Sequence, residues 1–234
     1  QMADTALNPR KRIGEIIGRP VEFYLGLKGA EKRRRVEELL ELIEMDPKEY
    51  INRLPSELSG GQKQRIGIAR AMAPQPDLII CDEPVSALDV AVQAQVLNLL
   101  RDLQSGRGLT YLFISHDLGV VQHMCDQIVV MYLGKIVEYA DRLSLFQNPL
   151  HPYTRALLSA VPRVDPTVRG GDRRLLLQGD PPDPANPPRG CRFAARCPVA
   201  ETRCHQEPPA LRTLRNKQQV ACHLVTEDAV SPLG

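Results

Sequence analysis

The chain has 234 residues, enough for one sizeable domain or a domain with an appendage. Thirty basic and 28 acidic residues nearly cancel, so no global field draws the chain onto nucleic acid. The longest apolar runs, at residues 78–81 and 109–114, are far shorter than the roughly 20 residues of a membrane-spanning helix, and the first residues lack the pattern of a secretion signal. We therefore expect a cytosolic chain that does not itself cross a bilayer.

The elements predicted from residue 31 onward alternate between helix and strand. Apolar residues at helical spacing predict a helix over residues 31–44, and further helices are expected at 62–72, 90–104 and after His116. Strands are expected at 78–81 and 110–114, and a hairpin at 127–139. Strands separated by helices of this length predict an α/β fold with a parallel sheet covered on both faces.

The composition changes near residue 141. Thirteen of the 20 prolines lie from Pro149 onward, and proline cannot continue a helix or a central strand. One helix at 153–160 and a strand-like stretch at 174–177 are the regular elements expected there. The predicted organisation is therefore residues 1–57, 58–140 and a proline-rich extension at 141–234.

Three motifs indicate phosphate chemistry. Residues 58–62 read Leu-Ser-Gly-Gly-Gln at the start of a helix, where Ser59 suits the N-cap and exposed amide groups attract an anion. An apolar strand ends at Asp82 and Glu83, which suit Mg²⁺ binding and the orientation of an attacking water. The next strand ends close to His116. Each motif alone has an ordinary structural explanation, as a helix cap, a polar turn or a structural histidine.

Together, in this order and spacing, the motifs closely resemble the ATP-binding cassette (ABC) family over residues 1–140. Residues 58–62 match its signature motif, 78–83 its Walker B strand, 86–89 its D-loop, and His116 its switch histidine. Segments 7–10, 13–17 and 148–154 resemble the ATP-binding subunits of dipeptide, oligopeptide and nickel importers. The resemblance implies a partial ABC-type (RecA-like) nucleotide-binding domain with a helical subdomain.

The resemblance also implies a role for each matched residue. Glu83 would be the general base and His116 would contact the γ-phosphate, so these two are the expected catalytic residues. Asp82 would bind Mg²⁺, and Asp89 would communicate across a cassette dimer. The remaining ATP-binding residues would be Gln1, at the position of the Q-loop glutamine, and the signature residues Ser59, Gly60, Gly61 and Gln62.

The implied function is ATP hydrolysis that energises peptide import. The expected partners are a second cassette, two transmembrane permease subunits and, indirectly, an extracytoplasmic solute-binding protein, with the chain peripheral on the cytoplasmic face of the inner membrane. The alternatives are nickel as the solute, a soluble ABC ATPase of DNA repair or translation, and a truncated, non-catalytic chain that completes a partner's site.

The sequence departs from the family at its phosphate-binding loop. No Gly-x-x-x-x-Gly-Lys-Ser/Thr segment, whose amides and lysine cradle the phosphates of ATP, occurs in the 234 residues. We therefore expect the chain alone to be inactive, either as a fragment that begins near the Q-loop or as a truncated product.

Four cysteines occupy the extension, at Cys191, Cys197, Cys204 and Cys222, with five, six and seventeen residues between them. Four thiols in a segment without a visible core favour a cross-link. Zinc sites usually contain cysteines two to four residues apart, whereas these wider spacings and the Cys197-Pro198 pair suit a [4Fe–4S] cluster. Such a cluster also fits the resemblance to peptide permease ATPases; zinc, unligated thiols and, least favoured in the cytosol, two disulfides are the alternatives.

Overall fold

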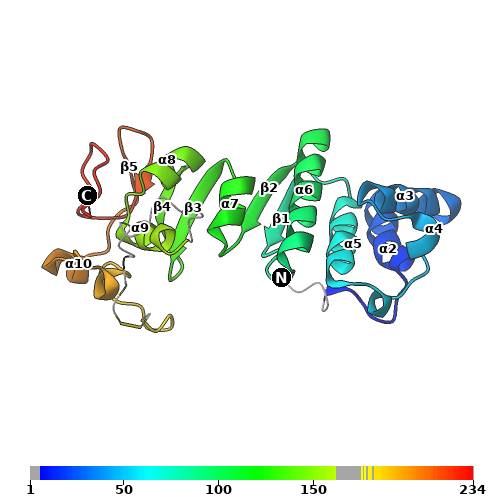
Figure 1. Ribbon diagram of the computed structural model, residues 1–234, viewed down its shortest axis with the longest axis horizontal. Helices are drawn as coiled ribbons and strands as arrows, with labels where there is room; N and C mark the ends of the chain where they lie inside the picture. Colours follow the sequence, from blue (N-terminus) through cyan, green and yellow to red (C-terminus); the bar gives the residue numbers. More distant parts are fainter. Residues whose placement is uncertain (1–5, 162–174, 176, 178, 181, 234) are drawn as a thin grey trace. The chain divides into compact units, whose positions relative to one another are not determined.

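The computed structural model describes residues 6–161, 175, 177, 179–180 and 182–233, so Gln1 lies outside the described residues. The chain forms two compact units, Gln1–His116 and Asp117–Gly234, and each is described by itself. The predicted boundaries at residues 57 and 140 stay predictions. Figure 1 labels most helices and strands of both units, and the helix labels begin at α2.

The first unit begins with a group of helices: α2 (Ile13–Leu25), α3 (Gly29–Leu42), α4 (Pro47–Tyr50), the 3₁₀ turn η1 (Pro55–Glu57) and α5 (Gly60–Met72). In Figure 1 the blue helices α2 and α3 lie beside the cyan α5. The helices meet through buried aliphatic side chains, namely Ile13, Ile17, Val21, Leu39, Leu40 and Ile66. These contacts confirm the helix expected at 31–44, which begins two residues earlier than predicted, and the helix expected at 62–72.

The same unit continues with two strands and the helix that connects them. Strand β1 (Leu78–Asp82) is followed by α6 (Val90–Arg107) and β2 (Thr110–Ile114). The strands pair in parallel, from Leu78 opposite Thr110 to Asp82 opposite Ile114. The Tyr111 hydroxyl donates to the Leu100 carbonyl at 2.9 Å and so attaches β2 to α6. The predicted βαβ arrangement is confirmed.

The expectation that this sheet is covered on both faces is wrong for the described residues. Apolar side chains at alternate positions of β1 and β2 share one face and are about half exposed, with relative exposures of 47–62% for Leu78, Ile80, Leu112 and Ile114. Because successive side chains of a strand point to opposite faces, the side chains that alternate with them, such as buried Cys81, belong to the other face. That face also holds Tyr111, which bonds α6.

The second unit is built on an antiparallel hairpin. Helix α7 (Leu118–Met124) precedes β3 (Gln127–Tyr132) and β4 (Lys135–Asp141), which are joined through Leu133 and Gly134 with φ of 46° and 74°. Helices α8 (Arg142–Gln147) and α9 (Pro152–Ser159) follow. The predicted hairpin and the helix near residues 153–160 are confirmed.

The extension adds short elements to this hairpin: the 3₁₀ turn η2 (Ala194–Arg196), helix α10 (Thr202–Gln206), β5 (Arg212–Thr213) and β6 (Gln219–Val220). Strand β6 pairs with β4, so the sheet has the order β3-β4-β6-β5. The strand-like stretch expected at 174–177 falls largely outside the described residues, and Leu175 and Leu177 are not in a strand.

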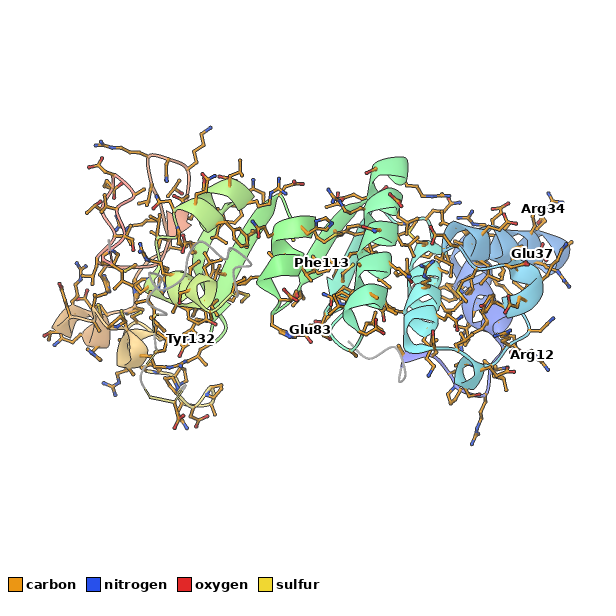
Figure 2. All side chains as sticks on the ribbon, in the orientation of Figure 1. Arg12, Arg34, Glu37, Glu83, Phe113 and Tyr132 are labelled. Atoms are coloured by element: carbon orange, nitrogen blue, oxygen red, sulfur yellow. The ribbon has the colours of Figure 1, made fainter. Side chains whose placement is uncertain are left out.

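The extension also has a core, contrary to the expectation from its sequence. Phe193 is 1% exposed, and its ring centroid lies 5.3 Å from that of Tyr132 and 5.5 Å from that of Tyr153 (Tyr132 is labelled in Figure 2). The sequence does not reveal this core because its aromatic residues come from β3, α9 and a loop more than 30 residues later. Across the described parts of both units, no helix is both long and apolar enough to cross a membrane.

Candidate active site

The carboxyl end of β1 brings Glu83 and His116 together. Because β1 and β2 are parallel, both strands end at the same edge, and the Glu83 amide donates to the Ile114 carbonyl at 2.9 Å. The His116 Nδ1 lies 2.9 Å from the Glu83 Oε1, within the first unit. Figure 2 shows Glu83 at this edge of the strands. The structure thus joins two predicted catalytic residues that are 33 positions apart.

The backbone of Glu83 is strained. Its φ is +44°, a value that non-glycine residues seldom adopt and that is common at functional sites. This conformation directs a side chain that is 25% exposed toward the imidazole. Since an ionised carboxylate only accepts hydrogen bonds, Nδ1 of His116 bears a proton in this arrangement. The other ring nitrogen, Nε2, is then the atom left to face a ligand.

Asp82 and Asp89 flank this pair along the chain. Asp82 is the last residue of β1 and is exposed. Asp89 is the N-cap of α6, and its carboxylate accepts from the Val92 amide at 2.9 Å. No group of three or more His, Cys, Asp or Glu side chains among the described residues is arranged to hold a metal ion. Asp82 could bind Mg²⁺ together with water or phosphate oxygens, which is how proteins commonly hold this ion.

The start of α5 presents the signature residues as predicted. Ser59 is the N-cap: its hydroxyl accepts from the Gln62 amide at 3.3 Å, and the Gln62 side-chain oxygen accepts from the Ser59 amide at 2.9 Å. This reciprocal capping box fixes the first turn. The amides of Gly60 and Gly61 belong to that turn, where helix geometry offers no intrahelical acceptor. They lie at the helix end where the sequence leads us to expect an anion.

Gly61 is required by packing against α6. A Cβ atom at this position would lie 2.3 Å from the Cγ1 of Val92, a distance that real Cβ atoms do not show. Val92 is also the residue whose amide Asp89 caps. The signature helix and the helix that follows the D-loop are therefore in contact through Gly61.

Comparison with known proteins agrees with this arrangement. Residues 2–86 match the ABC transporter family model, and residues 137–204 match the model of the oligopeptide/dipeptide transporter C-terminal region. A peptide import ATP-binding protein of Brucella ovis is 53% identical over 218 residues, which cover 93% of this chain and 68% of the relative. The chain belongs to the peptide-import ATP-binding proteins of the ABC transporter family.

Other relatives of this ABC protein agree. The oligopeptide transport ATP-binding protein AppF of Bacillus subtilis is 50% identical over 219 residues, covering 94% of this chain and 66% of AppF. Among solved structures, the dimeric ATP-binding cassette MJ0796 in a post-hydrolysis state bound to ADP and Pi is 32% identical, with a TM-score of 0.52. That match covers 58% of this chain and 59% of the MJ0796 chain. It supports the ABC ATPase fold.

None of the six cysteines of this ABC protein, all of which lie in the described part of the chain, forms a disulfide, and four of them are in the extension. The Cys191 amide donates to the Cys204 carbonyl at 2.7 Å. Burial raises the pKa of the Cys197 thiol to about 11, and the thiols of Cys222, Cys191 and Cys204 add to the rise. The four thiols therefore influence one another, but within the described chain they do not form a ready metal geometry. The expected [4Fe–4S] or zinc site is not supported by this arrangement.

Sequence reasoning missed two polar residues that link separate elements of the structure. The Tyr50 hydroxyl accepts from the side-chain amide of Gln62 at 3.0 Å, and Glu138, 0% exposed, accepts from the backbone amides of Leu150 and His151 at 2.8 and 2.9 Å. Each contact joins residues 12 or 13 positions apart in the chain. A glutamate among the apolar residues of β4 was the available signal for the second contact, whereas Tyr50 gave none.

Proposed function

We propose that this chain is the ATP-binding and ATP-hydrolysing subunit that energises import of dipeptides or oligopeptides through an ABC transporter. The observation on which the proposal rests is the 2.9 Å contact between Glu83 and His116 at the carboxyl end of two parallel strands. The names of the relatives, which describe peptide import, support the solute class. The match to the transporter C-terminal region favours this function over a soluble ABC ATPase of DNA repair or translation. Nickel is the alternative solute.

In the proposed reaction, Glu83 orients a water molecule and accepts its proton while the water oxygen attacks the γ-phosphorus. The bond from that phosphorus to the bridging oxygen of ADP breaks, and phosphate leaves. His116 would offer Nε2 to the γ-phosphate, which it can hydrogen-bond as a donor when the ring is protonated. Mg²⁺, held in part by Asp82, would neutralise charge on the phosphates.

The signature residues would serve the second half of a composite site. Ser59, Gly60 and Gly61, with Gln62 behind them, would face the γ-phosphate of an ATP held by another cassette. The Ser59 hydroxyl accepts from the Gln62 amide, so its own proton is available for a phosphate oxygen. Asp89 would lie at the interface of the two cassettes, and Gln1 would link the Mg²⁺ site to a permease subunit. The dimeric MJ0796 structure supports a dimer of cassettes.

The other partners follow from the proposed transport. ATP-driven closure of two cassettes would move a pair of transmembrane permease subunits, to which an extracytoplasmic binding protein delivers the peptide. The chain would then be peripheral on the cytoplasmic face of the membrane. Because its 234 residues contain no phosphate-binding loop, the chain by itself would be inactive, and hydrolysis is to be measured in an assembled transporter.

The variant that tests this function is Glu83→Gln. Loss of the carboxylate should lower ATP turnover in the assembled transporter by about 10²-fold or more, because the amide cannot accept the proton of water. ATP should remain bound. Glu37→Gln, which changes an exposed ion pair on α3, is the matched control and should hydrolyse normally. Wild-type turnover by the Glu83→Gln variant would show that Glu83 is not the base.

For the extension we propose a structural [4Fe–4S] cluster bound by Cys191, Cys197, Cys204 and Cys222. What supports it is the ligand chemistry of four thiols in one segment, whose wide spacing and Cys197-Pro198 pair suit such a cluster. Anaerobically purified protein should be brown, contain about four irons per chain, and lose both on Cys197→Ser but not on Cys125→Ser. Colourless protein with stoichiometric zinc would contradict the cluster, and metal-free protein would indicate unligated thiols.

A further inference from the structure

Tyr50 touches the signature motif from a separate helix. It is the last residue of α4, and its hydroxyl accepts from the Nε2 of Gln62 at 3.0 Å. The Oε1 of the same amide accepts from the Ser59 backbone amide at 2.9 Å. Both ends of the Gln62 side chain are therefore used. Since the Ser59 amide can only donate, the oxygen of Gln62 must face it, and the nitrogen is left to face Tyr50.

Tyr50 is itself held in place from several directions. Its amide donates to the Asp46 carbonyl at 3.0 Å, and the guanidinium of Arg53 lies 4.8 Å from the centre of its ring. The Arg53 side chain is in turn paired with Glu49 at 2.6 Å. These contacts leave the hydroxyl little freedom to turn away from Gln62.

The segment that follows Tyr50 is fixed to the start of α2. The carbonyls of Ile51 and Arg53 accept from the amides of Gly14 and Ile13, both at 2.9 Å. Gly14 allows this approach, because a Cβ there would lie 2.8 Å from the side chain of Ile51. Arg12, labelled in Figure 2, also bonds the Asn52 carbonyl. A continuous series of contacts thus runs from the start of α2 through Tyr50 to Ser59.

We propose that Tyr50 is a positioning residue for ATP binding at the signature motif. Its hydroxyl holds the Gln62 amide in the orientation that completes the capping box, and so keeps the first turn of α5 in register for the γ-phosphate. Tyr50, Gln62 and Ser59 line a cavity of about 330 Å³ together with Arg65 and Gln95, so water can replace a lost hydroxyl in part. Its removal should therefore weaken the site without abolishing it. This inference rests on the proposed function.

The test compares Tyr50→Phe, which keeps the ring and its contact with Arg53, with Tyr24→Phe, which removes the hydroxyl of a tyrosine that is 64% exposed. In the assembled transporter, Tyr50→Phe should raise KM for ATP about threefold to tenfold and change kcat by less than about twofold. Tyr24→Phe should change neither. In a Gln62→Ala background, Tyr50→Phe should produce no further rise in KM for ATP, because the contact between Tyr50 and Gln62 is already lost.

A second measurement on the full 234-residue chain needs no ATPase activity. Hydrogen exchange of the Ser59 amide should become severalfold faster in Tyr50→Phe, while the Val92 amide, capped by Asp89, exchanges as in the wild type. Unchanged Ser59 exchange, or faster exchange with unchanged KM, would overturn the proposal. If the wild-type assembly hydrolyses no ATP, the proposed function fails, and the exchange comparison still decides whether Tyr50 positions Ser59.

Discussion

Glu138 and His151 are two ionisable residues buried where the extension joins β4. Glu138 is 0% exposed and His151 1% exposed, and the His151 amide donates to the Glu138 carboxylate at 2.9 Å. Burial raises the pKa of Glu138, although the hydrogen bonds that it accepts oppose this rise. Burial lowers the pKa of His151 to about 3, so its ring is neutral. The ring Nδ1 caps α9 by accepting from the Tyr153 amide at 3.0 Å.

The neutral state of His151 predicts a loss of stability in acid. An unfolded histidine takes up a proton below a pH of about 6.5, whereas the folded one does not until about 3, so its contribution to stability is complete above pH 6.5 and falls as the pH drops toward 3. Between pH 7.5 and 5.5 this residue should cost about 1.4 kcal/mol of unfolding free energy. Glu138 acts in the opposite direction, because its raised pKa makes the folded state the better proton acceptor.

Denaturant unfolding of the wild type and of the His151→Asn variant, each at pH 7.5 and pH 5.5, measures this loss of stability. The amide oxygen of asparagine can still cap α9, but it does not titrate, so the variant should lack about 1.4 kcal/mol of the acid-induced loss. Glu138 is present in both proteins and its effect cancels. His205→Asn, at an exposed position of α10, is the matched control. Equal pH dependence in wild type and His151→Asn would contradict the prediction.

At the scale of elements, regular apolar patterns predicted those helices and strands that local sequence alone can determine. The helices α3, α5 and α6 and the strand β2 were expected because their apolar residues recur at the correct period. Helix α2 was missed, because Pro20 and two glycines interrupt its pattern. Its packing explains one glycine: at Gly14 a side chain would collide with Ile51. The two-residue strands β5 and β6 could not be predicted, since they exist only through pairing with β4 or with each other.

The contacts of the candidate site likewise differ in how far local sequence could predict them. The signature cap is local, so Ser59 and Gln62 could be predicted from four residues of sequence. The meeting of Glu83 and His116 depends on the parallel pairing of two strands, which the alternating pattern indicated but no local signal could place to within a hydrogen bond. The contact of Tyr50 with Gln62 depends on how two helices pack, and a tyrosine at the end of a short helix does not reveal it.

At the scale of the whole molecule, an ATP site needs two sets of groups, and the described chain offers one of them. The first unit offers a helix N-terminus at Ser59, and a carboxylate with an imidazole at Glu83 and His116. A nucleotide also needs amides and a lysine around its β- and γ-phosphates, and these come from a loop that the 234 residues do not contain. The proposed site is therefore complete only when another chain or segment supplies that loop.

This division predicts how the 234-residue chain behaves alone with ATP. The helix dipole and a few amides favour an anion by about 0.3–1 kcal/mol at an exposed site, far less than the roughly 4 kcal/mol that a dissociation constant of 1 mM represents. Calorimetry should therefore show no saturable binding at about 1 mM ATP. When a full-length cassette that contains a phosphate-binding loop is added, ATP should promote association of the two chains. Ser59→Arg, which crowds the phosphate, should prevent that association, whereas Tyr24→Phe should not. Micromolar affinity of the isolated chain for ATP would contradict this division of the site.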